Sequence, residues 1–136
     1  MAIFRILGRV IDSNTSGVVS GLRIEAWDKD LIVNNLVGSA ITDDHGSFGM
    51  EFDESYFQEL FADQRPDIFF KVFCDQQLVK STDNSVLWNL DIGDTQVLIN
   101  LDNYSKYKVY QKSLKAADQG VEDNPKLLYI GIDNSS

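Results

Sequence analysis

The side chains best placed for chemistry are closely spaced carboxylates in polar segments of the chain. Asp28 and Asp30 lie two positions apart and are followed by Asn35, and Asp43 and Asp44 form a second group. Calcium takes about six to eight oxygen ligands, so acidic residues must converge on it from more than one loop. The spacing therefore makes these residues candidate ligands of a calcium site. The interpretation that we favour is that the aspartates form turns, because their side chains bond to nearby backbone groups.

Histidine and cysteine each occur once, as His45 and Cys74. This inventory excludes two-histidine iron sites, helical zinc motifs, cysteine-based zinc clusters and an internal disulfide. We interpret His45 as a solvated turn residue rather than a proton acceptor or metal ligand, and Cys74 as a small core residue. Because we find no activated nucleophile and no paired acid and base, we expect that the chain is not an enzyme and needs no cofactor, with calcium as the one candidate ligand.

Three aromatic residues fall outside the main apolar register of their segments: Trp27, Phe69 and Phe73. They alternate with charged residues, which predicts a mixed aromatic and charged face on a sheet. An exposed face of this kind is typical of protein-binding surfaces, because aromatic residues dominate the energetics of interfaces. The interpretation that we favour is that another segment of the same chain covers the rings.

The elements that position these residues are predicted to be β-strands, because apolar residues recur with a period of two. A short helix is predicted over residues 53–61, where Asp53 caps a helical repeat of apolar residues that ends before Pro66. Seven or so strands without alternating helices predict a mainly β, antiparallel β-sandwich. The strand-like segments are residues 3–11, 22–28, 36–42, 47–52, 67–74, 77–81, 85–90 and 95–101.

Charge divides the chain near Asp102. Residues 1–102 hold seven basic and 17 acidic residues, a balance of −10, whereas residues 103–136 hold five and four, a balance of +1. We therefore predict a sandwich domain over residues 1–102 and a separate C-terminal tail. The net charge of −9 argues against nucleic acid and anionic membranes as partners.

The tail combines a helical pattern with a short apolar segment. Tyr107 and Tyr110 lie on one stripe of a predicted amphipathic helix, with lysines mostly off that stripe. Residues 127–132, LLYIGI, are apolar and β-prone, and they predict a last strand that docks on its own domain or on a neighbouring copy. We therefore expect a protein partner or self-association, with Trp27, Phe69, Phe73, Tyr107 and Tyr110 as candidate contact residues.

The order of four segments resembles transthyretin-like, or prealbumin-like, β-sandwich domains in their bacterial form. These segments are GRVID, GLRIEAWDKD, LVGSAITDDHGSFGMEF and PDIFFKVF, and the resemblance spans Ile3 to Leu101. The most specific part pairs Glu25–Asp30 with the turn Thr42–Phe48. The resemblance implies a sandwich that binds or scaffolds, either alone or as a module of larger proteins, insecticidal-toxin-related ones included.

Two groups of enzymes with this general architecture need residues that this chain lacks. Transthyretin-related hydrolases of urate breakdown use more than one histidine and a C-terminal Tyr-Arg-Gly-Ser-type motif, whereas this chain ends in LLYIGIDNSS. Intradiol dioxygenases hold iron with two tyrosines and two histidines. We therefore expect a non-enzymatic interaction or assembly module, with a calcium-dependent loop binder of carbohydrate or membrane headgroups as the alternative. Since the sequence shows no signal peptide or membrane span, we expect it in the cytoplasm.

Overall fold

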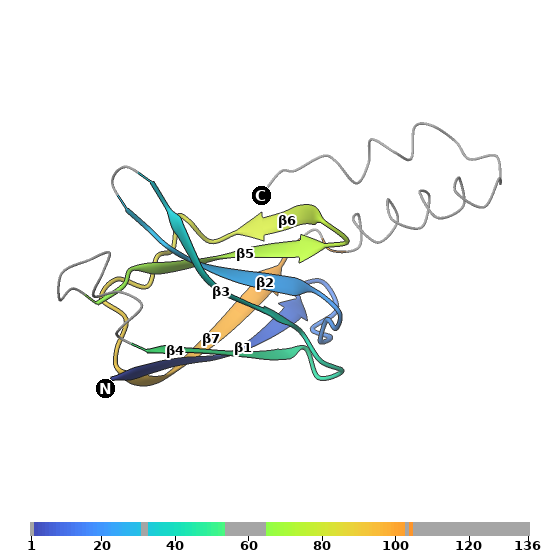
Figure 1. Ribbon diagram of the computed structural model, residues 1–136. Helices are drawn as coiled ribbons and strands as arrows, with labels where there is room; N and C mark the ends of the chain where they lie inside the picture. The colour runs from blue at the N-terminus through green and yellow to red at the C-terminus, as the bar shows by residue number, and fades with distance from the viewer. Residues whose placement is uncertain (1, 31–32, 54–64, 103, 105–136) are drawn as a thin grey trace.

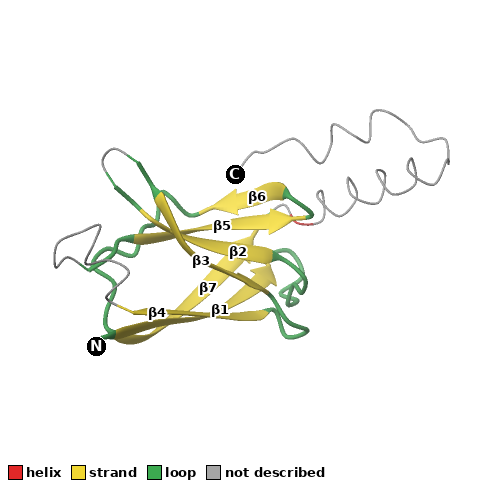
Figure 2. Ribbon diagram, in the orientation of Figure 1, coloured by secondary structure: helices red, strands yellow, loops and turns green. Residues whose placement is uncertain are grey.

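The alternation of apolar and polar residues builds two facing sheets, as the computed structural model shows (Figure 1). The structure describes residues 2–30, 33–53, 65–102 and 104. Strands account for nearly all of its regular structure (Figure 2). The seven strands are β1 (Ile3–Asp12), β2 (Arg23–Asp28), β3 (Asn35–Ile41), β4 (Ser47–Asp53), β5 (Ile68–Cys74), β6 (Gln77–Ser81) and β7 (Gly93–Leu101).

One sheet has the strand order β4-β1-β7 and the other has the order β3-β2-β5-β6. The mainly β sandwich predicted from the sequence is therefore confirmed, with one difference in strand direction. β1 and β7 run parallel, from Phe4 opposite Gly93 to Asp12 opposite Leu101, whereas the other pairs are antiparallel. A parallel pair needs a long crossover connection, and the chain between β1 and β7 supplies one: it forms the four strands of the second sheet and also β4, which returns to the first sheet.

The core lies between the two sheets and is formed by every second residue of most strands. Ile6 from β1, Ile24 from β2 and Val72 from β5 are fully buried. The sheets contact each other through Phe48 and Phe70, whose rings meet edge to face with centroids 6.1 Å apart. This packing fixes which side chains of each strand point outward.

Gly8 is required at the centre of the three-stranded sheet because the Phe48 ring lies against its backbone. A Cβ atom on Gly8 would overlap the Phe48 ring. The two residues are directly opposite in the β1–β4 ladder. The Phe48 ring therefore fills the space that a side chain at position 8 would occupy.

The turn between β3 and β4 connects the edge strands of the two sheets. Asp43 accepts backbone hydrogen bonds from Ser47 and His45 at its Oδ1, both at 2.9 Å. These bonds, that from Ser47 first, lower the pKa of Asp43 below its usual value. Gly46 completes the turn at a φ of 70°, and a Cβ atom there would lie 2.8 Å from the carbonyl oxygen of Val10.

One predicted strand is not formed, and the predicted helix and tail lie mostly beyond the part of the chain that the structure describes. Residues 85–90 do not form the strand that was predicted: they make an isolated bridge from Leu87 to Ile68 and then turn, with Asn89 at a φ of 50°. The Asp67 carboxylate holds this turn by accepting a hydrogen bond from the Asn89 amide at 2.8 Å. The helix predicted over residues 53–61 and the tail from Asn103 lie almost wholly outside the described residues. Within the described part of the chain, no helix is both long and apolar enough to cross a membrane.

Candidate functional site

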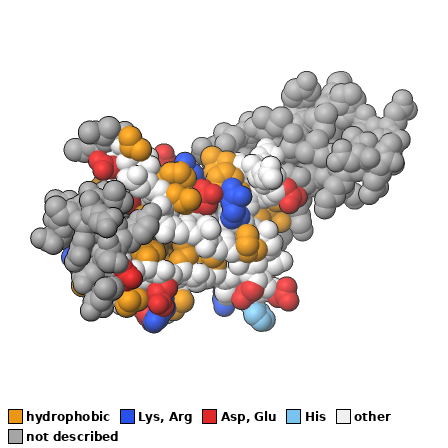
Figure 3. Space-filling model, in the orientation of Figure 1, with side chains coloured by type: hydrophobic (Ala, Val, Ile, Leu, Met, Phe, Trp, Pro, Cys, Tyr) orange, Lys and Arg blue, Asp and Glu red, His pale blue; other side chains and the backbone are white. Residues whose placement is uncertain are grey.

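The structure brings Trp27, Phe69 and Phe73 together on the outer face of the four-stranded sheet. Trp27 on β2 is paired with Phe69 on β5, and Phe73 is paired with Arg23 on β2. Phe69 is buried and yet lies outside the cluster of residues that forms the core. Hydrophobic side chains lie next to basic and acidic ones on the face of the molecule seen in Figure 3.

A continuous set of contacts connects the side chains of this face, and we call it the outer-face network. The Lys71 Nζ lies 4.1 Å from the centroid of the Trp27 ring. The Trp27 indole donates a hydrogen bond of 3.0 Å to Glu25, which also pairs with Arg23 at 3.2 Å. The Arg23 guanidinium in turn lies 4.5 Å from the centroid of the Phe73 ring. Each cation is thus held over an aromatic face, an attraction that strengthens where water is partly excluded.

The network is partly accessible and has an apolar border. Phe69 is 1% exposed, so contact with a partner would fall on Trp27 and Phe73, which are half-buried. Neighbouring strands add large apolar side chains that are at least one-third exposed. They are Leu36 and Ile41 of β3 and Leu78 of β6.

The sequence indicated the aromatic residues of the network but not which aromatic ring each charged residue contacts. The Nε atom of Arg23 is buried and has no hydrogen-bond partner among the described residues. The alternation of Arg23, Glu25 and Lys71 with the aromatic residues was the available signal. Only the register of β2 against β5 shows which cation lies over which ring.

Asp28 is a buried carboxylate at the end of β2. Its Oδ1 accepts a hydrogen bond of 2.8 Å from the Asp67 amide, whereas its buried Oδ2 has no partner among the described residues. Burial raises the pKa of Asp28 to about 6, although the Asp67 amide hydrogen bond acts in the opposite direction; the nearby charges of Asp67 and Asp30 also raise it. Asp28 therefore fixes the chain segment before β5 at the cost of burying a carboxyl group.

The residues proposed as calcium ligands are divided between the two ends of the sandwich. Asp28 pairs with Asn35 at one end of the β2–β3 ladder, close to Asp30 in sequence. Asp43 and Asp44 follow the opposite end, beyond the pair of Arg23 with Ile41. The structure therefore does not bring these residues into one site. Among the described residues, no three His, Cys, Asp or Glu side chains are grouped to hold a metal.

Of the remaining candidate residues, one lies in an exposed turn, one packs against the core, and two fall outside the described residues. His45 is exposed in the β3–β4 turn, and its backbone amide donates to Asp43. Cys74 is half-buried and packs against the core. Tyr107 and Tyr110 lie outside the described part of the chain.

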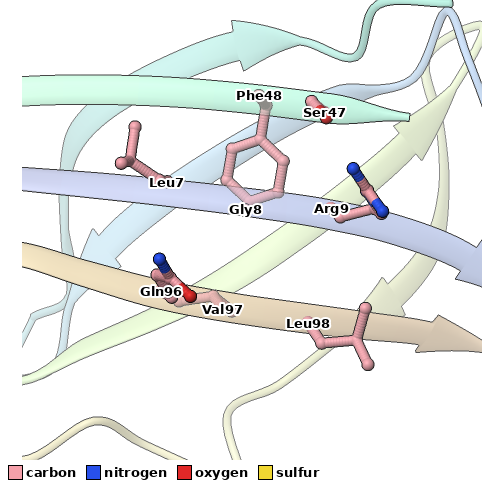
Figure 4. Close-up of a pocket in the computed structure, with 8 residues that line it drawn as sticks. All are labelled: Leu7, Gly8, Arg9, Ser47, Phe48, Gln96, Val97 and Leu98. Carbon is pink, nitrogen blue, oxygen red and sulfur yellow. The ribbon is translucent and has the colours of Figure 1, made fainter. Parts of the chain in front are cut away.

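A shallow depression of about 570 Å³ lies on the three-stranded sheet (Figure 4). It was not predicted from the sequence. Leu7 and Arg9 of β1 and Gln96 and Leu98 of β7 lie around it, and the backbone near Gly8 forms part of its lining. Polar and apolar groups are mixed here without a buried charge or a cluster of titratable groups, so the geometry indicates no chemistry for it.

Known proteins resemble this chain in fold and not in sequence. No protein-family model matches the sequence, and no curated protein matches it. Solved structures do match. A 9R-lipoxygenase from Cyanothece PCC8801 aligns with a TM-score of 0.53 at 18% identity, over 73% of this chain and 16% of the lipoxygenase. This chain thus spans about a sixth of that enzyme, and the likeness shows a shared β-sandwich fold.

Two further solved structures show weaker likeness. The dioxygenase domain of a dioxygenase carbohydrate-binding protein fusion from Streptomyces sp. SirexAA-E has a TM-score of 0.48 at 14% identity, over 74% of this chain and 80% of that domain. A DUF3823 family protein from Bacteroides uniformis has a TM-score of 0.44 at 18% identity, over 71% of this chain and 42% of that protein.

These comparisons correct one expectation drawn from the sequence. The chain was expected not to be an enzyme, but its sandwich is similar to part of a catalytic protein, a lipoxygenase. The fold therefore gives no ground for excluding catalysis. At such low identity the likeness shows the fold and assigns no reaction to this chain, because one fold can support unrelated functions.

Proposed function

We propose that this chain is a protein-binding module that contacts its partner through the outer face of its four-stranded sheet. The observation that carries the proposal is the outer-face network, in which Trp27 and Phe73 are held in place by Lys71 and Arg23. Aromatic and arginine side chains supply most of the binding energy of protein interfaces. Side chains that are already fixed before binding lose less conformational entropy when the complex forms.

The surroundings of the network support contact with a protein surface of mixed character. Exposed Leu36 and Leu78 border the network on either side and supply apolar area without charge. Glu25 is the one acidic member, and its carboxylate is engaged with Arg23 and with the Trp27 indole. The network therefore offers a partner two cations stacked on aromatic rings, a surface that suits a partner with apolar and acidic side chains.

Affinity capture with matched variants tests the proposal. The full chain is immobilised and exposed to a lysate of the cells that make it, beside the variants Trp27→Ala, Phe73→Ala and Leu7→Ala. Leu7 is an exposed apolar residue on the opposite sheet and serves as the control. We expect at least one captured protein to be reduced about tenfold by each aromatic variant and unchanged by Leu7→Ala. Capture that is equal in all variants would contradict the proposal.

A further inference from the structure

Among the described strands, β7 leaves one edge of the sandwich unpaired. β7 pairs with β1 on one side, and no other described strand pairs with its second edge. The direction of its backbone groups follows from two hydrogen bonds. The carbonyl of Leu101 accepts from the Ser13 amide on the β1 side, whereas the carbonyl of Asn100 accepts from the Lys80 ammonium at 2.8 Å on the other. Because backbone direction alternates along a strand, the backbone groups of Asp94, Gln96, Leu98 and Asn100 point toward the open edge.

The other edge strands carry features that discourage further pairing. β6 is only five residues long and has an irregular register next to β5. β3 also has a register shift, and the turn at residues 42–46 joins it directly to β4, which closes that side of the sandwich. β7 has nine residues in unbroken register with β1, contains no lysine or proline, and has Asp94 as its one charged residue. Lys80 of β6 contacts this edge at one end, at the Asn100 carbonyl, and the rest of the edge carries none of the features that discourage pairing at β3 and β6.

A groove of about 250 Å³ runs beside this edge. Phe70 and Leu87 line it from the four-stranded sheet and its following loop, and Val97 and Ile99 line it from β7. Val97 is half-buried and packs against the core, so its side chain is incompletely covered. A strand added to β7 would place every second side chain over this groove and would extend the core.

We propose that the occupant of this edge is β7 of a second copy of the chain, paired antiparallel across a two-fold axis that passes at Val97. Val97 is the central residue of Gly93–Leu101, so this register overlaps the whole strand. It also sets Gln96 opposite Leu98 of the second copy, which aligns the edge-directed backbone groups of both strands. The two Val97 side chains meet on the groove side and bury one another.

Charge favours the same chain as the occupant in this register. Asp94 lies opposite Asn100 of the second copy rather than opposite its own equivalent, so the one charged residue of the strand meets no like charge. Lys80, which now bonds to the Asn100 carbonyl, is brought near Asp94 of the second copy. The strand is thus complementary to itself when it runs antiparallel, as a two-fold interface requires.

Sedimentation equilibrium of the full-length chain tests the dimer and its register together. Asn100→Asp places a negative charge opposite Asp94, and we expect it to weaken the dimer about tenfold through the two symmetric pairs. Asn100→Lys places a positive charge there and is expected to strengthen the dimer by a similar factor. The double variant Asp94→Lys with Asn100→Asp exchanges the two charges of that pair, so it should strengthen the dimer as Asn100→Lys does rather than weaken it as Asn100→Asp does.

A backbone variant provides an independent measurement. The Gln96 amide points away from β1, so Gln96→Pro removes no hydrogen bond of the sheet but blocks the paired edge, and it should yield a folded monomer. Leu7→Lys, on the same outer face but on the central strand, is the control and should leave the dimer intact. A chain that is monomeric at about 1 mM, or a dimer with the same dissociation constant in all these variants, would overturn the proposal. Trp27→Ala should not affect this dimer, which separates its failure from that of the proposed function.

Discussion

The outer faces of the two sheets place arginine and lysine side chains in different surroundings. On the three-stranded sheet, Arg5 pairs with Glu51 and Asp94 in side-chain contacts that are about half exposed. On the four-stranded sheet, Arg23 and Lys71 lie over aromatic rings. Exposed ion pairs contribute little because water and salt screen them, whereas a cation over a ring also covers apolar surface. Contacts between its own side chains thus hold the outer face of the four-stranded sheet in one arrangement. The three-stranded sheet depends instead on the packing of its inner face, where the Phe48 ring lies against Gly8.

The largest expected effect tests whether the three-stranded sheet depends on its inner packing. Gly8→Ala places a methyl group where the Phe48 ring lies, and because Phe48 is buried we expect a loss of about 3 kcal/mol in the free energy of unfolding, measured by chemical denaturation. Gly21→Ala is the control, since Gly21 has a φ of 76° but a Cβ atom there would meet open space, and it should cost about 1 kcal/mol. Equal losses in the two variants would contradict the interpretation.

The next effect concerns the buried carboxylate at the end of the four-stranded sheet. The raised pKa of Asp28, about 6, means that the folded chain binds more protons than the unfolded chain between about pH 4 and pH 6. Its contribution to stability is therefore present at low pH and is lost as the pH rises through that window. Asp28→Asn removes this titration, so its stability relative to the unmodified chain should rise by about 2 kcal/mol from pH 4 to pH 7.

Thermal unfolding at several pH values measures this difference. Asp83→Asn, in an exposed loop, controls for the loss of one negative charge. A pH-independent difference between Asp28→Asn and the unmodified chain would show that burial does not perturb this carboxyl group.

A smaller effect compares the two faces through a double-mutant cycle on the outer-face network. We expect Trp27→Leu and Lys71→Met to be coupled by about 1 kcal/mol in chemical denaturation, because the ammonium lies over the ring. The coupling should persist in about 1 M salt, since part of it comes from packing of the lysine stem on the ring. If the losses in free energy of unfolding for the two single variants are additive, the contact between Lys71 and Trp27 does not hold this face in place before binding.

The smallest effect is expected for Arg5 on the opposite face. The same cycle with Arg5→Met and Asp94→Asn should give a coupling below that of Trp27 with Lys71, and about 1 M salt should abolish it. A coupling at Arg5 that equals or exceeds the other would reverse the ranking of the two faces.

Local patterns determined the strands and the turn between β3 and β4. Strict alternation in residues 22–28 set Ile24 and Ala26 inward and Trp27 outward, and the structure places them so. The Asp43 to Gly46 turn also follows from local residue types, since it depends on the conformational freedom of one glycine and on bonds between near neighbours. The hairpin that such a turn predicts is not formed, because β3 and β4 on either side of it lie in different sheets. The predicted strand over residues 85–90 was wrong because its backbone bonds to Asp67 and Pro66, which are distant in sequence.

The sequence by itself determined a β-sandwich with a face that alternates aromatic and charged residues, because a period of two decides which side chains share a face. Only the tertiary structure decided which residues meet. It separated Asp28 from Asp43 by the length of the β2–β3 ladder, placed Lys71 over Trp27, and left the second edge of β7 without a partner among the described strands. Strand order and register arise from packing between segments far apart in the chain, and local periodicity does not specify them.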